Sequence, residues 1–249
     1  MHVGLNELRG RPEYAHVIRD QTKSVSVVRQ AGCSESCRRR SQAQRNLAIN
    51  AGNVSFDPLQ QGTISQGGQL SITAAAISVS GTWNYGGQGA SLYGINGLTN
   101  TGTITGSSPL TLTTGGTFTN YGQVIGNDVT INGTLSNAAG AVMHAGDSLS
   151  LNGSVTNRGT VESAGNLTFN GGGNYDNQYG TTQANGNITL NTGATVYNTV
   201  GTITAGGNIG INAGAVINDA LQGQTQTSTQ LVGASADPDS VTKIVDRSI

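Results

Sequence analysis

The sequence contains few charged and few aromatic residues. Charged residues make up 10% of its 249 residues and aromatic residues 4%, whereas about 25% charged residues is usual for a soluble domain. A polar chain kept unfolded by charge repulsion is therefore excluded, and so is a bulky globular core. The 38 glycines, together with many Asn, Thr and Ser and a thin supply of Val, Ile and Leu, favour a repetitive β architecture with a narrow core.

Cysteines and long apolar runs are also scarce. The two cysteines, Cys33 and Cys37, lie close together near the start, so no disulfide framework holds the remaining chain. The first thirty residues lack the apolar stretch of a signal peptide, and no run approaches the roughly 20 apolar residues of a membrane-spanning helix. We expect neither an export signal nor a membrane span within this chain.

The charge distribution divides the chain. Residues 1–45 hold nine Arg or Lys against four Asp or Glu, whereas residues 46–249 hold three basic against nine acidic residues. We interpret residues 1–45 as a non-repeat basic leader, which is helical, disordered or the product of a misassigned start codon. Residues 46–218 form the repeat array, and residues 219–249 are a polar linker or a C-terminal cap.

A short apolar–polar–apolar unit recurs along the array. From Leu110 onward the steps are 19, 20, 18, 21 and 21 residues, and the gap of 40 between Leu70 and Leu110 equals two periods, with an irregular coil around Trp83 to Tyr93. The units are Leu47-Ala48-Ile49, Leu70-Ser71-Ile72, Leu110-Thr111-Leu112, Val129-Thr130-Ile131, Leu149-Ser150-Leu151, Leu167-Thr168-Phe169, Ile188-Thr189-Leu190 and Ile209-Gly210-Ile211.

A series of asparagines keeps the same period. Its steps are 20, 17, 20, 20, 21 and 20 residues, and stacking on that period would form an amide ladder in which each side chain bonds to the next. The predicted ladder consists of Asn100, Asn120, Asn137, Asn157, Asn177, Asn198 and Asn218.

These two markers predict an all-β, right-handed parallel β-helix with about 20 residues per coil. Each triplet has the period of a strand with one buried face, and Gly and Asn supply the corners. Each coil stacks on the next in parallel at about 4.8 Å, which gives a rod roughly 40 Å long. A helical fold lacks the necessary spacing. A β-sandwich would not need a 20-residue period, and disorder is the remaining alternative.

Residues able to carry catalysis or bind metal are sparse. The repeat holds one histidine, His144, which we expect at a corner or facing solvent. Asp57, Asp128, Asp147, Arg158, Glu162 and Asp176 stand about one per coil. We expect Asp147 to meet the Arg158–Glu162 segment on an adjacent coil as a surface ion pair. Cys33 and Cys37 lack a third ligand nearby. We therefore expect no enzyme activity, no metal, no cofactor and no nucleic-acid partner.

Three further motifs have structural explanations. Gly171–Tyr179 partly matches a calcium-binding nonapeptide, but a glycine-rich turn is the simpler interpretation. Thr103-x-Thr105 and Thr202-x-Thr204 suggest a flat ice-binding face, which Gln123-x-Ile125 and Thr160-x-Glu162 interrupt. Five sequons for N-glycosylation follow mainly from the repeat, although glycan attachment stays open. They begin at Asn53, Asn132, Asn152, Asn166 and Asn187.

The units Asn157–Asn170 and Asn198–Asn212 resemble the repeats of filamentous-haemagglutinin-like adhesins, which are two-partner-secretion exoproteins. The resemblance covers residues 46–218. It implies a large parent protein of Gram-negative bacteria that crosses the outer membrane through a partner β-barrel transporter and folds on the cell surface. The Asn-Pro-Asn motifs of that family's secretion domain are absent, and no recognisable toxin domain follows the repeats, so this chain is expected to be an internal shaft segment or a short reading frame derived from one.

The function that the resemblance implies is adhesion through the parent protein to host-cell surfaces, glycans or neighbouring bacterial cells. One alternative is the stalk of a contact-dependent growth inhibition toxin. A second alternative, a carbohydrate-active β-helix enzyme, requires carboxylates that converge in a groove.

Overall fold

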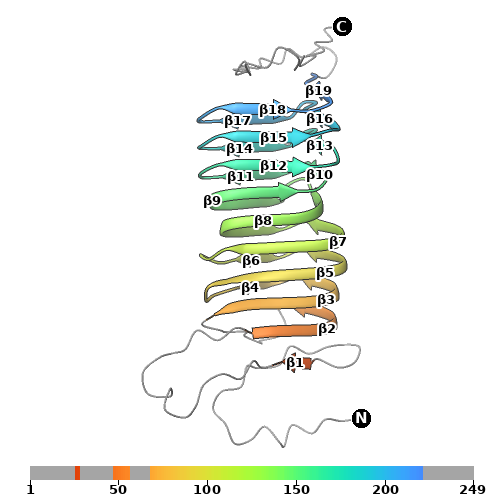
Figure 1. The fold of residues 1–249 in the computed structure, drawn as a ribbon, viewed down its shortest axis with the longest axis vertical. Helices are drawn as coiled ribbons and strands as arrows, with labels where there is room; N and C mark the ends of the chain where they lie inside the picture. Colours follow the sequence, from red (N-terminus) through yellow and green to blue (C-terminus); the bar gives the residue numbers. More distant parts are fainter. Residues whose placement is uncertain (1–25, 29–46, 57–67, 221–249) are drawn as a thin grey trace, which may run out of the picture.

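The computed structural model describes residues 26–28, 47–56 and 68–220, which form a β-solenoid (Figure 1). Within these ranges all regular structure is strand. The first coils comprise β2 (Leu47–Phe56), β3 (Gln69–Val79), β4 (Thr82–Asn84), β5 (Gly89–Asn100), β6 (Thr103–Thr105), β7 (Leu110–Asn120), β8 (Gln123–Asn137) and β9 (Val142–Asn152).

The later coils are divided into shorter strands. They are β10 (Val155–Asn157), β11 (Thr160–Ser163), β12 (Leu167–Gly171), β13 (Tyr175–Asp176), β14 (Thr181–Ala184), β15 (Ile188–Thr192), β16 (Thr195–Tyr197), β17 (Thr202–Ala205), β18 (Ile209–Asn212) and β19 (Ala215–Ile217). Figure 1 shows the coils stacked one above another from β2 to β18.

Strand pairing between coils is parallel and follows the predicted period. Leu167 of β12 pairs with Leu149 of β9 below and with Ile188 of β15 above. Asn157 of β10 likewise pairs with Asn137 of β8. The all-β parallel solenoid with about 20 residues per coil is therefore confirmed.

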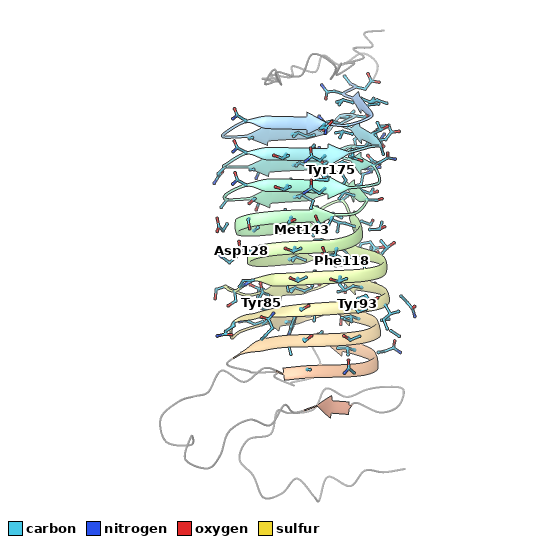
Figure 2. All side chains as sticks on the ribbon, in the orientation of Figure 1. Tyr85, Tyr93, Phe118, Asp128, Met143 and Tyr175 are labelled. Atoms are coloured by element: carbon cyan, nitrogen blue, oxygen red, sulfur yellow. The ribbon has the colours of Figure 1, made fainter. Side chains whose placement is uncertain are left out.

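Each coil has three faces, which we name by their place relative to the ladder. The triplet face holds the apolar–polar–apolar units; the pre-ladder face holds the strand that ends at the ladder asparagine; the post-ladder face holds the strand that follows it. Alternate residues on each face point inward, so that Leu112, Phe118 and Val124 on successive faces are all buried. Figure 2 shows labelled core residues Phe118, Met143 and Tyr175 along the rod.

The coil expected to be irregular around Trp83 to Tyr93 is in register on its triplet face. Ala90-Ser91-Leu92 pairs with Leu70-Ser71-Ile72 on one side and with Leu110-Thr111-Leu112 on the other. The sequence pattern hid this triplet because Ala90 is small. The adjoining post-ladder strand compensates with larger side chains: Trp83 stacks on Phe56 with ring centroids 4.6 Å apart.

The 17-residue step between Asn120 and Asn137 arises from a bulge. Thr113 pairs with Asn132 and Thr117 pairs with Thr134, so three residues of β7 face the single residue Gly133 of β8. The corner after Asn137 is in turn longer than its neighbours, since Val142 pairs with Thr160, which lies three residues after Asn157. Extra residues are thus absorbed at corners and the register of the faces is kept.

The N-terminal edge of the solenoid carries a strand of opposite direction. β1 (Ser26–Val28) pairs antiparallel with β2, with Val27 opposite Ile49. This strand falls within residues 1–45, where the sequence pattern predicted none. Its backbone pairs with the edge of β2, a type of edge that otherwise invites aggregation. The expectations for Cys33, Cys37 and most of residues 219–249 lie outside the described residues.

Candidate functional site

The predicted asparagine ladder lies at the corner between the pre-ladder and post-ladder faces. The Nδ2 atom of each asparagine donates to the Oδ1 atom of the asparagine one coil further on. The distances are 2.8 Å for Asn100 to Asn120, 2.8 Å for Asn120 to Asn137, 2.9 Å for Asn137 to Asn157, 2.8 Å for Asn157 to Asn177, 2.8 Å for Asn177 to Asn198 and 2.9 Å for Asn198 to Asn218. All seven side chains therefore form one unbroken row.

The central amide of the ladder, Asn157, is fully hydrogen-bonded. Asn157 is completely buried. Its Nδ2 also donates to the carbonyl of Thr181 at 2.9 Å, and its Oδ1 also accepts from the backbone N–H of Gly159 at 3.1 Å. An amide has two donor hydrogens and one acceptor oxygen with two lone pairs. Every bonding position of Asn157 is thus occupied, which removes the free-energy cost of burying it.

A polar branch connects the ladder to the core. The Thr182 hydroxyl donates to Asn177 Oδ1 at 2.9 Å and lies 2.8 Å from the hydroxyl of Tyr175. Both side chains are buried. Burial raises the pKa of the Tyr175 phenol far above its usual range, and the hydrogen bond with Thr182 lowers it only in part. The sequence repeat gave no signal for this branch, because Val161 and Ile203 occupy the same position as Thr182 in adjacent coils.

The charged groups of the repeat pair across coils, but with different partners from those expected. Arg158 makes a bidentate ion pair with Asp176, with nitrogen–oxygen distances of 2.9 and 2.7 Å. Glu162 contacts His144 at 2.7 Å and accepts from Gln183 at 2.6 Å.

The expected pairing of Asp147 with the Arg158–Glu162 segment is wrong. The cause is register: Glu162 stands directly opposite His144 on the post-ladder face. Asp147 instead lies at a corner, where its backbone carbonyl accepts from Ser163. His144 lies on a strand of the post-ladder face, β9, and not at a corner, and its side chain is partly exposed to solvent as expected. Asp176, which belongs to the partial calcium-binding nonapeptide match, forms its ion pair with Arg158.

No cluster of three or more His, Cys, Asp or Glu side chains suited to a metal ion occurs among the described residues. Asp57 lies outside them. Asp128 is held locally, since it accepts from Ser148 at 2.6 Å and from Asn127 at 3.0 Å. The described ranges also contain no helix with the length and hydropathy needed to cross a bilayer.

The outer side of the triplet face carries an unbroken column of hydroxyl groups, which the sequence analysis missed. The middle residue of each triplet pairs with the middle residue of the next, and successive hydroxyls stand about 4.8 Å apart. This hydroxyl column consists of Ser71, Ser91, Thr111, Thr130, Ser150, Thr168 and Thr189. The Ser or Thr in the middle of each triplet is the sequence feature from which the column could have been predicted.

An outer amide row lies beside the hydroxyl column, two residues further along each strand. Asn152 donates to Asn132 at 2.9 Å, and Asn191 donates to Asn170 at 3.0 Å. Unlike the buried ladder, these bonds are partly or fully exposed to solvent. The triplet face is consequently neutral and polar along the described rod. By contrast, the threonine pattern of the post-ladder face is interrupted. Thr105 pairs with Ile125 in the next coil. In the column that contains Thr160 and Thr181, the preceding coil holds Val142.

Two exposed tyrosines mark the ladder corner. Tyr121 and Tyr179 are 59% and 60% exposed. Tyr179 adopts a positive φ of 57°, and Val200, one coil further, has a φ of 54°. Side chains other than glycine are strained in this conformation. The corner tolerates it because the N–H groups of Tyr179 and Val200 bond to the carbonyls of Thr199 and Asp219.

A comparison with known protein families matches the haemagglutinin repeat in three segments, residues 42–92, 95–200 and 183–237. No curated protein matches the chain, and no solved structure matches it. The matched segments cover the described solenoid from β2 to β19, apart from residues 93–94 of β5, and contain all seven ladder asparagines. The chain therefore belongs to the haemagglutinin repeat family.

Proposed function

We propose that this chain is a shaft segment of a large adhesin on the bacterial surface. The observation that carries the proposal is the uninterrupted amide ladder from Asn100 to Asn218, with each amide bonded to the next coil. Such a row links neighbouring coils along the rod and resists bending or separation of any one coil from the next. A structure of this kind transmits force and holds a binding region away from the cell.

The outer faces support the same proposal. The triplet face is neutral and polar, and the ion pair between Arg158 and Asp176 on the described coils is partly exposed. Such a pair contributes little to stability, and the acidic excess of residues 46–249 gives no positive field that would draw the chain to nucleic acid. The haemagglutinin repeat is typical of secreted surface proteins, and so we place the parent protein on the cell surface.

The finer parts of the proposal concern partners. We propose that the parent protein is exported through an outer-membrane partner transporter and binds host surfaces, glycans or neighbouring bacterial cells. The resemblance of the repeat units to filamentous-haemagglutinin-like adhesins supports this assignment. The exposed Tyr121 and Tyr179 at the ladder corner offer the kind of aromatic surface that interfaces use.

Two measurements on the purified full chain test the proposal. Small-angle X-ray scattering should give the profile of a rigid rod with a straight section of about 40 Å. Beads coated with the chain should be retained on epithelial cells or on a lawn of bacteria more than beads coated with the heat-unfolded chain.

The outcomes separate the alternatives. A compact or random-coil scattering profile would overturn the shaft. A rod without bead retention would remove direct adhesion from this segment and leave a passive spacer. Release of reducing sugar ends from polysaccharides, measured in the same samples, would favour the enzyme alternative and contradict the proposal.

A further inference from the structure

The structure distinguishes among the four sequons that begin at Asn132, Asn152, Asn166 and Asn187 by what their amide nitrogens contact. N-glycosylation attaches a sugar to the Nδ2 atom of the asparagine in an Asn-x-Ser/Thr motif. A suitable site therefore needs an exposed asparagine whose Nδ2 is not already used as a donor. Asn53 lies on β2, and the other four sequons lie along the triplet face and its corners.

Asn166 and Asn187 meet these requirements. Each is exposed and stands at the corner that precedes a triplet, one coil apart. The Oδ1 atom of Asn166 accepts the backbone N–H of Asn187 at 2.8 Å, and the Oδ1 atom of Asn187 accepts that of Asn208 at 2.8 Å. The oxygen thus fixes each amide to the next coil, while Nδ2 donates to no described residue.

The packing around the two oxygens keeps the amides in this orientation. A Cβ atom added at Gly186 would overlap Asn166 Oδ1, and one added at Gly207 would overlap Asn187 Oδ1. The amide oxygen therefore occupies a narrow space against the backbone of the next coil. Because the oxygen faces the coil, the nitrogen on the other side of the amide is presented outward.

Asn132 and Asn152 differ in this respect. Asn132 donates through Nδ2 to the Thr113 hydroxyl at 3.3 Å, and Asn152 donates through Nδ2 to Asn132 at 2.9 Å. Their nitrogens face the neighbouring coil within the outer amide row. A sugar on either nitrogen would have to enter between two stacked coils.

We propose that Asn166 and Asn187 are sites of N-glycosylation, with a sugar activated as a nucleotide or lipid diphosphate as the donor. In the transfer, Nδ2 forms a bond to the anomeric carbon, and the bond between that carbon and the diphosphate oxygen breaks. The electron pair of the broken bond leaves with the diphosphate. One Nδ2 proton passes to a base of the transferase, and the amide keeps its second hydrogen.

The geometry also limits the sugar. Glycans on Asn166 and Asn187 stand about one coil step, ~4.8 Å, apart. Occupancy of both sites therefore favours a short, unbranched sugar at each. The attached sugars would extend the neutral polar triplet face beside the hydroxyl residues Thr168 and Thr189, which are the third residues of the two sequons and pair with each other.

Asn208 supplies a matched control within the same row. It follows Asn187 at the same corner and is exposed, but the residue two positions later is Gly210. No described atom lies within 4 Å of a Cβ added at Gly210. A threonine at this position therefore fits on the outer surface, continues the hydroxyl column and completes a third sequon without altering Asn208.

The test is peptide mass spectrometry of the full chain isolated from the cells that naturally produce it. The peptides are fragmented with the sugar still attached, and the mass that a sugar adds to an asparagine serves as the label. We expect label at Asn166 and Asn187 and none at Asn132 or Asn152. Thr168→Val should abolish label at Asn166 alone, Thr189→Val should abolish it at Asn187 alone, and Gly210→Thr should add it at Asn208.

The valine variants keep the asparagine and its hydrogen bond, and valine suits a strand, so circular dichroism should show an unchanged fold. An unlabelled Asn166 and Asn187 in the natural chain would overturn the proposal. Label at Asn132 or Asn152, or label at Asn166 that persists in Thr168→Val, would also contradict it. None of these outcomes bears on the scattering profile of the rod, so this proposal and the shaft proposal fail separately.

Discussion

Replacing Asn157 by alanine removes one central member of the buried ladder. The substitution deletes four hydrogen bonds: those to Asn177, Asn137, the Thr181 carbonyl and the Gly159 N–H. A hydrogen bond contributes about 0.5–1.5 kcal/mol net, so the expected loss in free energy of unfolding is about 2–6 kcal/mol. The partly buried Gly159 N–H also loses its acceptor, which places the expected value toward the upper part of that range.

Asn170→Ala is the matched control. Asn170 accepts one exposed hydrogen bond from Asn191 in the outer amide row, at 3.0 Å. The same change of residue type therefore removes one solvent-accessible bond instead of four bonds that are buried or partly buried. We expect a loss of no more than about 0.5 kcal/mol, the usual range for exposed substitutions.

The assay is urea unfolding of the full chain followed by circular dichroism, with hydrogen exchange of the amides in β10, β11 and β13 as a local measurement. Stacked repeats interact mainly with their neighbours, so exchange should increase first in the coils beside residue 157. If Asn157→Ala shifted the urea midpoint no more than Asn170→Ala does, the ladder would not stabilise the solenoid, and the basis of the shaft proposal would be lost.

Val200 holds a φ of 54°, and this conformation costs a β-branched residue about 1–2 kcal/mol. After the entropy cost of glycine is subtracted, Val200→Gly should raise the free energy of unfolding by about 0.5–1 kcal/mol. A lowered thermal midpoint would contradict this. Gly122→Ala should destabilise the chain by about 2 kcal/mol or more in urea unfolding, because the added Cβ would overlap the Gly102 carbonyl. Gly172→Ala is the control, because a Cβ added at Gly172 meets no atom within 4 Å. Burial raises the pKa of Tyr85 from 10.0 to about 12, so its stabilising contribution is complete below pH 10 and is lost as the pH rises through about 12. Tyr85→Phe should therefore lose stability less steeply over that pH interval, and an equal slope in both proteins would refute the assignment.

The sequence by itself determined the period, the strand type and the ladder positions. Parallel in-register stacking places each residue above its equivalent one coil earlier, so a repeated Leu-x-Ile or Asn becomes a repeated environment. This is why the triplets at Leu110 and Leu149 and the asparagines from Asn100 onward could be located without coordinates. The same logic failed at Ala90, where a small residue replaced the expected Leu and its place in the register was visible only in the pairing with Leu70 and Leu110.

The tertiary structure alone decided which of the repeated asparagines are buried and which way each amide faces. Asn157 and Asn170 are both repeated asparagines, yet one is enclosed by three faces and the other is open to solvent. The cause is the direction of each side chain at its place in the coil, since Asn157 points inward at the ladder corner and Asn170 points outward beside the triplet. The partners of Glu162 and Arg158 and the free nitrogens of Asn166 and Asn187 likewise depend on contacts between coils, which a period measured along one chain does not specify.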